Sequence, residues 1–499
     1  MDSIIQALGI LVTFENLGLL AVGTAVGIFV GAMPGLSVNM GLALLFPITF
    51  SVGGWHGIIM LLGIYCGAIY GGSITAILLK TPGTPASAAT TLDGYPMARG
   101  GQPGRALAIS TTASTFGGIF STVCLVLFAP MLAKVALQFS KPEYFALAIF
   151  GISMITSVAP GSILKGIIGC LVGLWIATIG LDPMSGMERF TFGTLYLSGG
   201  ISFMPILIGL FALTQVFINA EEMYHKSTTA QKITIDSVYP KCEDMKLISP
   251  TLVRSSAIGT FIGCVPGTGG DISSWICYNQ AKTWAKDKSK FGKGDPRGIA
   301  ASESGNNSIV GGAFIPVLTL GIPGDGATAI ILGALMVHGI QPGPLLFINH
   351  AVDVYTVFLG LMIANFVMGF FGFSLIRLFS KVTMIPMVFL LPIIAVMAVI
   401  GTYSYANSMQ DVYIMFAAGL IGYFMYKFDM GVPGVIIGII LGKLAEQNFT
   451  GSLMMSDGSL SIFATSPICF IFLILALIGL LSPLYKDALR RIFAKRVSA

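Results

Sequence analysis

Charged residues are scarce in this chain: Asp, Glu, Lys and Arg account for only 10% of its 499 residues. Ordinary soluble domains are about one quarter charged, because their surface must be covered by groups that water solvates. The sequence therefore argues against a soluble globular protein. The net charge of +5 is better explained by the orientation of loops across a membrane than by a nucleic-acid partner.

Several common signals are also missing. The first residues, MDSIIQALGILVTF, have no basic region and no small-residue cleavage site, so we expect no removable signal peptide. The seven Cys are scattered, without disulfide or metal-ligand spacing. The sequence has no P-loop, no H-E-x-x-H, no G-x-S-x-G and no paired aspartate motif. We therefore expect that the protein is not an enzyme and that it uses no cofactor. The alternative from a different functional class is an intramembrane enzyme.

Apolar residues are abundant. Hydrophobic residues make up 55% of the sequence, the mean hydropathy is +0.87, and long apolar stretches recur almost from end to end. We predict an all-α polytopic membrane protein in a lipid bilayer, with about 11 crossings plus two re-entrant hairpins. The first ~16 residues hold too short an apolar run to span a membrane, so they either lie in the interface or extend the next helix.

Two separate motifs occur twice, in the same order. The stretch GIFVGAMPGLSVN at 27–39 matches GTFIGCVPGTGGD at 259–271. Further along, YGGSITAILLKTPGTPASA at 70–88 matches GGAFIPVLTLGIPGDGATA at 311–329. Ordered matches at several points indicate an internal duplication.

The charges of equivalent loops indicate that the two copies run in opposite directions through the membrane. The loop after the first motif has no Lys or Arg in the first copy, but six in the second, between residues 282 and 297. After the second motif the asymmetry reverses, because Arg99 and Arg105 have no counterpart in HGIQPGP of the second copy. Since cytoplasmic loops are enriched in Lys and Arg, the sequence predicts an inverted repeat with a cytoplasmic C-terminus.

Each half is predicted to contain a hairpin, a discontinuous helix broken at a Pro-Gly motif, and scaffold helices. Backbone at bilayer depth must be hydrogen-bonded, so such breaks persist only inside protein or beside a water-filled cavity. Thr84 and Asp325 are predicted to be the N-caps that follow the two breaks. The predicted boundaries are 1–220 for the first half (hairpin 17–49, broken helix 57–98, scaffold helices 106–220), 221–250 for a cytoplasmic linker, 251–485 for the second half (hairpin 251–281, broken helix 299–340, scaffold helices 351–482) and 486–499 for a basic cytoplasmic tail.

The hairpin tips and helix breaks form the predicted site. Helix N-termini suit anions, whereas unwound carbonyls suit cations. The first half offers neutral or positive groups and the second offers two acids, so we expect the first to bind mainly a carboxylate and the second mainly a driving cation. The predicted substrate-binding residues are Pro34, Gly35, Ser37, Asn39, Lys80, Thr81, Pro82, Gly83, Thr84, Ser87, Pro266, Gly267, Thr268, Gly269, Pro323 and Gly324, and the predicted coupling-ion residues, with Na+ as one candidate metal, are Asn39, Gly270, Asp271 and Asp325.

Two of these residues have a plainer explanation. Lys80 is also explained by snorkelling to the membrane interface, and Asp325 by capping its helix. Glycines at four-residue spacing, such as 23, 27 and 31, are expected to let helices pack closely rather than to carry chemistry.

Other polar residues near the motifs also allow two explanations. Glu303, Asn306 and Asn307 in ASESGNN either line the cytoplasmic exit or, as we favour, cap a helix and bond between helices. Asp93 is expected to organise a turn with Arg99 or Arg105, with a conformational latch as the alternative.

The same motifs resemble those of a known family. GAMPGLSVN, KTPGTPASAATTLDGYPMARGGQPGRAL, PGTGGDISSW, ASESGNN and LGIPGDGATAIILGALMVHGIQPGP are similar to the signatures of the TctA family, over roughly residues 15 to 485. That family is the large membrane subunit of bacterial tripartite tricarboxylate transporters. The resemblance implies a permease of the bacterial cytoplasmic (inner) membrane, driven by an ion gradient. It also implies a small TctB-type membrane subunit and a periplasmic TctC-type solute-binding protein that delivers a carboxylate such as citrate or another organic acid.

The expected function is therefore import of a tricarboxylate or other organic acid by alternating access, coupled to Na+ or H+. Hairpins paired with broken helices favour an elevator-like movement, with rocking as the alternative. A stand-alone carboxylate symporter without a receptor and a non-transporting membrane scaffold are the remaining alternatives. The choice of acid, the coupling ion and the oligomeric state stay open from sequence.

Overall fold

The computed structural model of the protein describes residues 2–33, 35–153, 163–182, 184–225, 235, 238–266, 269–382 and 387–481. Helices make up nearly all the regular structure in these ranges. Their strands are limited to β1 (Gly180–Leu181) and β2 (Glu188–Arg189), which pair antiparallel. The prediction of an all-α polytopic membrane protein is confirmed.

Several helices have the length and composition of membrane spans. In the described part of the chain, six segments are long and apolar enough to cross a membrane: Phe14–Gly31, Gly54–Leu79, Pro103–Ala136, Phe203–Glu221, Ala351–Ser374 and Val388–Ala406. Shorter apolar helices, among them Pro467–Leu481, add to these. The total number of crossings and the re-entrant nature of the two hairpins stay predictions.

The chain forms two compact units. Unit 1 contains residues 1–134 and 204–420, and unit 2 contains residues 135–203 and 421–499. Neither unit coincides with one predicted half. The predicted halves are defined by repeated sequence motifs, whereas the two units are defined by packing. The boundaries of the halves therefore stay a prediction.

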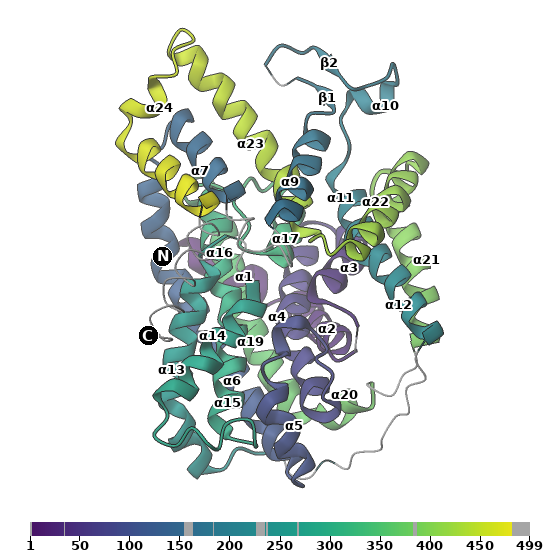
Figure 1. The fold of residues 1–499 in the computed structure, drawn as a ribbon, viewed down its shortest axis with the longest axis vertical. Helices are drawn as coiled ribbons and strands as arrows, with labels where there is room; N and C mark the ends of the chain where they lie inside the picture. Colours follow the sequence, from purple (N-terminus) through teal and green to yellow (C-terminus); the bar gives the residue numbers. More distant parts are fainter. Residues whose placement is uncertain are drawn as a thin grey trace, which may run out of the picture. The chain divides into compact units, whose positions relative to one another are not determined.

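Unit 1 holds both hairpins and both broken helices (Figure 1). Three further helices cross the unit boundary: α6 (Pro103–Ala136) ends in unit 2, α11 (Phe203–Leu207) begins there with Phe203, and α22 (Met409–Lys427) begins in unit 1. The other helical elements of unit 1 are α1 (Asp2–Leu11), α2 (Phe14–Gly31), α3 (Val38–Val52), α4 (Gly54–Leu79), the 3-10 turn η1 (Pro85–Ser87), α5 (Thr91–Arg99), the π-helical η2 (Ile208–Leu213), α12 (Thr214–His225), α13 (Cys242–Gly263), α14 (Gly269–Trp284), α15 (Pro296–Asn307), α16 (Ile309–Leu320), α17 (Gly326–Val337), α18 (Leu346–Asn349), α19 (Ala351–Ser374), α20 (Ile376–Val382) and α21 (Met387–Ala406).

The N-terminal residues form a helix of their own. Helix α1 ends at Leu11, and α2 starts after Thr13, whose hydroxyl accepts a hydrogen bond from the Asn16 N–H. The first residues therefore do not extend the next helix as one continuous element. Instead, α1 packs against α19.

Helix α4 lies at the centre of unit 1, with every residue from Gly57 to Leu78 buried. Its glycines face those of α2, and the two helices run side by side (Figure 1). A Cβ atom at Gly27 would lie 2.3 Å from the Ile64 carbonyl oxygen, and one at Gly67 would lie 2.3 Å from the Thr24 carbonyl oxygen. The prediction that glycines at four-residue spacing serve close packing is confirmed here.

Unit 2 is built around α23 (Pro433–Met455), which packs against α7 (Lys141–Ser153) and α9 (Ile163–Ala177), as Figure 1 shows. Glycine again permits the approach, because a Cβ at Gly438 would lie 2.4 Å from the Cys170 carbonyl oxygen. Arg189 ties the β1–β2 hairpin to α23 through an ion pair with Glu446. The remaining elements of unit 2 are α10 (Leu195–Ser198), α24 (Ile462–Thr465) and the helix Pro467–Leu481.

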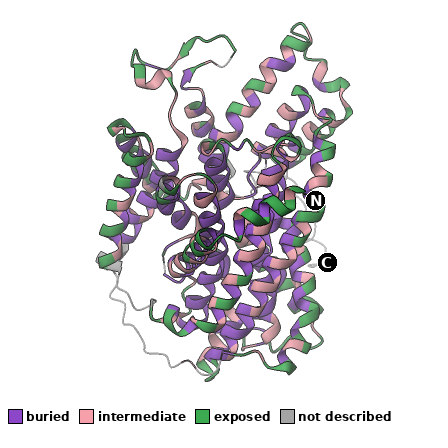
Figure 2. Cartoon of the chain, turned by 180° about the vertical axis from the view of Figure 1, so that it is seen from behind, coloured by how far each residue is buried: buried purple, intermediate pink, exposed green. Residues whose placement is uncertain are grey.

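Many helices expose large apolar side chains along one side and bury the other (Figure 2). On α6, Leu127, Phe128 and Met131 are more than half exposed, and α21 presents Phe389 and Ile393 in the same way. Exposed apolar surface of this extent suits contact with lipid, where no hydrophobic penalty applies. The exposed sides of these helices thus agree with a membrane protein.

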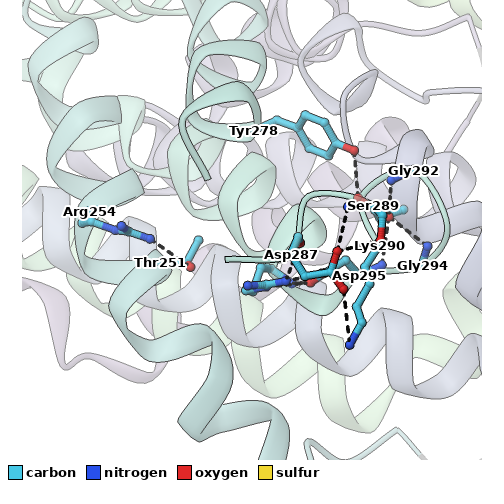
Figure 3. A network of polar contacts seen from close by, with 11 residues as sticks. Thr251, Arg254, Tyr278, Asp287, Ser289, Lys290, Gly292, Gly294 and Asp295 are labelled. Carbon is cyan, nitrogen blue, oxygen red and sulfur yellow. Dashed lines mark hydrogen bonds and ion pairs between the residues drawn. The ribbon is translucent and has the colours of Figure 1, made fainter. Parts of the chain in front are cut away.

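A buried carboxylate joins the two sequence halves. Asp93 on α5 is fully buried, and its Oδ1 accepts hydrogen bonds from the backbone N–H groups of Gly292, Gly294 and Asp295, each at 2.8 Å. Its Oδ2 accepts a hydrogen bond from the Tyr278 hydroxyl at 2.9 Å. Figure 3 shows Tyr278, Gly292, Gly294 and Asp295 gathered around this point. One side chain of the first half therefore holds the basic loop of the second.

The expected turn between Asp93 and an arginine is wrong. Arg99 instead donates to the Tyr95 hydroxyl, and Arg105 forms an ion pair with Asp244 on α13. Four donors from α14 and the loop after it satisfy Asp93, so an arginine is not needed to balance the buried group.

The glycine contact between α2 and α4 leads to a paired prediction. We expect Gly27→Ala to lower the unfolding temperature of the detergent-solubilised protein, because overpacking typically costs about 1–3 kcal/mol. Gly18→Ala on the same helix should leave it unchanged or raise it, since no atom lies within 4 Å of the added methyl group. Equal unfolding temperatures in the two variants would contradict the close contact.

The Asp93 junction leads to a second prediction. Asp93→Asn should lower the unfolding temperature and speed proteolysis of the loop at 285–295, because each buried donor left unpaired costs about 1–3 kcal/mol. The matched control is Asp287→Asn in the same loop. Hydrogen bonds from the Ser289 hydroxyl and N–H lower the pKa of Asp287, but the side chain is half exposed, so little change is expected. Similar behaviour of both variants would argue against a structural role for Asp93.

Candidate functional site

The two predicted breaks end their helices in the same way. Helix α4 ends at Lys80 with a φ of 61°, and α16 ends at Gly321 with a φ of 69°. Both values fall in the left-handed region, which stops a helix and turns the chain. Glycine adopts this conformation without cost, whereas Lys80 adopts it with backbone strain. The predicted discontinuity at both positions is confirmed.

Beyond each break, the predicted N-cap is present. The Ser87 hydroxyl donates to the Thr84 carbonyl at 2.8 Å and to the Gly72 carbonyl at 2.9 Å. In the second half, Asp325 Oδ1 accepts from the Thr328 N–H at 2.8 Å and from its hydroxyl at 2.6 Å. The second break continues into the regular helix α17, whereas the first leads only into the short turn η1 and, after Thr90, into α5.

The hairpin tips are also helix starts. Ser37 caps α3, its hydroxyl accepting from the Met40 N–H at 3.1 Å. Helix α14 begins at Gly269, whose φ of 61° marks the turn, and Asp271 lies in its first turn. Each tip therefore directs a helix N-terminus, with its positive dipole end, toward the centre of unit 1.

The structure brings these tips and breaks together. Each tip contacts the break of the other half, and the second tip also lies beside the break of its own half. A Cβ at Gly326, which begins α17, would lie 2.6 Å from Asn39 Nδ2 of the first hairpin. A Cβ at Gly270 of the second hairpin would lie 3.0 Å from Ala86 Cβ in η1, and one at Gly269 would lie 4.0 Å from Asp325 Cβ. Predicted residues of both groups, among them Asn39, Gly269 and Gly270, therefore lie next to residues of the two breaks.

Two carboxylates dominate the charge of this site. Asp325 is half-buried, and its Oδ2 accepts from the Tyr65 hydroxyl at 3.5 Å. Asp271 keeps an exposed side chain and lies within electrostatic range of Asp325. No ion pair joins either carboxylate to a Lys, Arg or His within the described ranges. Two unneutralised acids at one place favour a bound cation.

The predicted positive group is less central. Lys80 is exposed, and its Nζ lies 5.7 Å from the centre of the Tyr95 ring, a cation–π distance. Thr81 beside it is exposed as well. Lys80 thus points toward α5 rather than toward the two acids.

The other predicted residues are mainly backbone elements of the site. The Gly35 carbonyl is exposed at the first tip and accepts from Asn219 Nδ2 at 3.1 Å. Gly83 and Gly324 are buried where the chain passes close to other helices. Pro82 and Pro266 are half-buried, and Pro323 is buried. Predicted residues that lie outside the described ranges are Pro34, Gly267 and Thr268.

Four contacting residues were not among the predicted site residues: Tyr65 beside Asp325, Phe211 beside Gly326, Asn219 at the first tip, and Asn306 beside Gly270. Tyr65 and Asn306 occupy matched positions when the alignment of the second motif is extended toward the N-terminus. That register could have indicated both, because each is a polar residue in the helical segment that precedes a break. Phe211 and Asn219 come from a segment without a motif, so no sequence signal marks them.

The described residues contain no group of three His, Cys, Asp or Glu side chains that could hold a metal ion. The oxygen-bearing side chains near the tips and breaks provide carboxylate, amide and hydroxyl oxygens, and they belong to Asp271, Asp325, Asn39 and Tyr65. Such oxygen donors suit hard cations rather than transition metals.

Comparison with known proteins supports the resemblance noted from the motifs. Residues 17–437 match the tripartite tricarboxylate transporter TctA family. An uncharacterised 52.8 kDa protein in the TAR-I ttuC' 3' region of Agrobacterium vitis is 37% identical over 447 residues, or 90% of this chain and 89% of that protein. An uncharacterised protein in the TAR-II ttuC' 3' region of the same organism is 33% identical over 220 residues, or 44% of this chain and 91% of that protein. No solved structure matches the chain.

The family match covers both hairpins, both helix breaks and every residue of the site described above. Membership implies a multi-pass membrane subunit of a transport system that has other subunits, and a transporter rather than an enzyme. This chain belongs to the tripartite tricarboxylate transporter TctA family.

Proposed function

We propose that this subunit imports a carboxylate, a tricarboxylate or another organic acid, by alternating access coupled to a cation gradient. The observation that carries the proposal is the meeting of both hairpin tips with both helix breaks around Asp271 and Asp325. Irregular backbone of this kind in a membrane protein is tolerated where it lines a substrate or ion site.

The carboxylate is proposed to bind at the N-termini of α3 and α14. Ser37 satisfies only one of the first N–H groups of α3, and Asp271 lies in the first turn of α14 rather than at its cap. Unpaired N–H groups and the positive dipole end favour an anion at such a place. Asp325 already occupies the corresponding position at α17, so the anion would use the other two helix ends.

The coupling ion, Na+ or H+, is proposed to bind at Asp271 and Asp325, with Asn39 and the Gly270 backbone nearby. A cation there would offset the two acids and allow the anionic substrate to approach. Binding of one would then favour binding of the other, which is the coupling that an ion-driven importer needs.

The movement is proposed to be elevator-like. In unit 1, α2 packs on α4, α13 packs on α15 and α16, and α14 contacts η1. Glycines bring the backbones of α2 and α4, and those of α13 and α16, into direct contact. Such close packing supports the movement of these helices as one body.

The assembly is proposed to follow the family pattern. A small TctB-type membrane subunit would accompany the chain in the bacterial inner membrane, and a periplasmic TctC-type protein would deliver the acid. The C-terminus is proposed to be cytoplasmic, in agreement with the basic residues near the end of the sequence.

Uptake by proteoliposomes tests the proposal. Liposomes that contain this chain and the small subunit should accumulate a labelled carboxylate only when the solute-binding protein and an inward sodium or proton gradient are both present. Citrate and other di- and tricarboxylates would be tried in turn, and liposomes without the chain serve as the control. Absence of receptor-dependent uptake for every acid would overturn the proposal, and receptor-independent uptake would favour a stand-alone symporter.

Substitution of the two acids tests the cation role. Asp271→Asn and Asp325→Asn should each raise the ion concentration for half-maximal uptake about tenfold, equivalent to about 1.4 kcal/mol, with a smaller change in substrate affinity. Asp353→Asn is the matched control, because Asp353 pairs with His350 at the start of α19, away from the site. Unchanged ion dependence in both site variants would rule out the assignment.

A further inference from the structure

A second acid lies in the interior of unit 1, outside the site described above. Glu303 on α15 is completely buried. Its Oε1 accepts from the Thr90 hydroxyl at 2.5 Å and its Oε2 from the Ser114 hydroxyl at 3.0 Å. No Lys, Arg or His forms an ion pair with it within the described ranges. A buried carboxylate without a counter-charge is costly, so this group calls for a neutralising partner.

Two asparagines follow Glu303 within one helical turn. Asn307 donates from Nδ2 to the Ser114 hydroxyl at 2.9 Å and to the Glu303 carbonyl at 3.0 Å, but its Oδ1 has no hydrogen-bond partner among the described residues. Asn306, only 1% exposed, has no partner for either atom of its amide group in the part of the chain that the structure describes. Buried amides are nearly always hydrogen-bonded, so these orphan atoms indicate a ligand that the described residues do not supply.

Helices α15 and α16 are separated by one residue. Helix α15 ends at Asn307 and α16 begins at Ile309, but Ser308 between them keeps near-helical backbone angles (φ −72°, ψ −11°), and its N–H donates to the Ser304 carbonyl. The carboxylate and the amide oxygens thus lie beside a one-residue irregularity in the helix, so the side chains rather than a helix end favour a cation there.

The first half of the repeat lacks this arrangement. At the positions matching Glu303 and Asn307 it carries Leu62 and Cys66, both buried inside the uninterrupted helix α4. The position of Asn306 matches Tyr65, which is also polar, so the acid and the amide of Asn307 are what the second half adds.

We propose that Glu303, Asn306 and Asn307 form a second, buried sodium site, with Thr90 and Ser114 positioning the carboxylate. Sodium neutralises the acid and uses the free amide oxygens. The inference extends the proposed function, because it gives the same transporter a further ion site. Asn306 also borders Gly270 at the second hairpin tip, so the two ion sites are neighbours.

Sodium binding is measured without substrate or transport, so failure of uptake and failure of this site are distinguishable. The full chain in detergent is heated in NaCl or in choline chloride at equal ionic strength, and the sodium-dependent rise in unfolding temperature is titrated. Sodium that binds only the native state raises the unfolding temperature, so the titration reports the affinity for sodium. Because Glu303→Gln removes the carboxylate charge, we expect the half-maximal sodium concentration to be at least about tenfold higher in this variant.

Asn306→Ala keeps the test informative if the glutamine variant does not fold. The Asn306 amide makes no hydrogen bond within the described residues, so if it were only structural, its truncation would leave the sodium-dependent rise in unfolding temperature unchanged. If Asn306 binds sodium, the rise in the alanine variant becomes smaller, and this is the result that we expect. The control is Asn365→Ala, a buried asparagine whose Nδ2 bonds to the Leu361 carbonyl. A sodium response that is lost in Asp325→Asn but unchanged in Glu303→Gln and Asn306→Ala would overturn the site, as would no sodium response in the unchanged chain.

Discussion

The structure depends on one constraint: backbone groups away from water need partners, and two helices stop just before segments that are buried among other helices, at Gly83 and Gly324. At α4 and α16 the chain leaves the helix through left-handed residues, Lys80 and Gly321. The free ends are then satisfied locally, by Ser87 in one half and by Asp325 with Thr328 in the other. Those solutions are specific, and they leave helix ends and carbonyls available to a ligand.

Close backbone contact holds these ends in place. The glycine seams between α2 and α4, and between α13 and α16, leave no room for side chains, as the 2.3 Å separations at Gly27 and at Gly312 show. With little hydrophobic force between helices in lipid, such packing and polar contacts must supply the stability. The buried Asp93 adds a polar contact that fastens the loop of one half to a helix of the other.

The two halves share a backbone plan but differ in chemistry. Thr84 and Asp325 cap equivalent breaks, yet only the second brings a charge. Leu62 and Glu303 likewise stand at matched positions, one apolar and one acidic. Under the proposed function, the acids of the second half would hold a cation close to an anion at the helix N-termini of both hairpins. That combination is the physical basis that we propose for coupled import.

The sequence by itself determined the helical class, the family, the positions of both breaks and the identities of their N-caps, because Pro, Gly and capping residues act through local backbone geometry. It also indicated that glycines serve packing. Only the tertiary structure left the amide of Asn306 without a partner among the described residues. Only the tertiary structure, too, decided that each hairpin tip meets the break of the other half and that Asp93 binds backbone amides rather than an arginine. These last two outcomes depend on contacts between residues more than 150 positions apart, which no local pattern encodes.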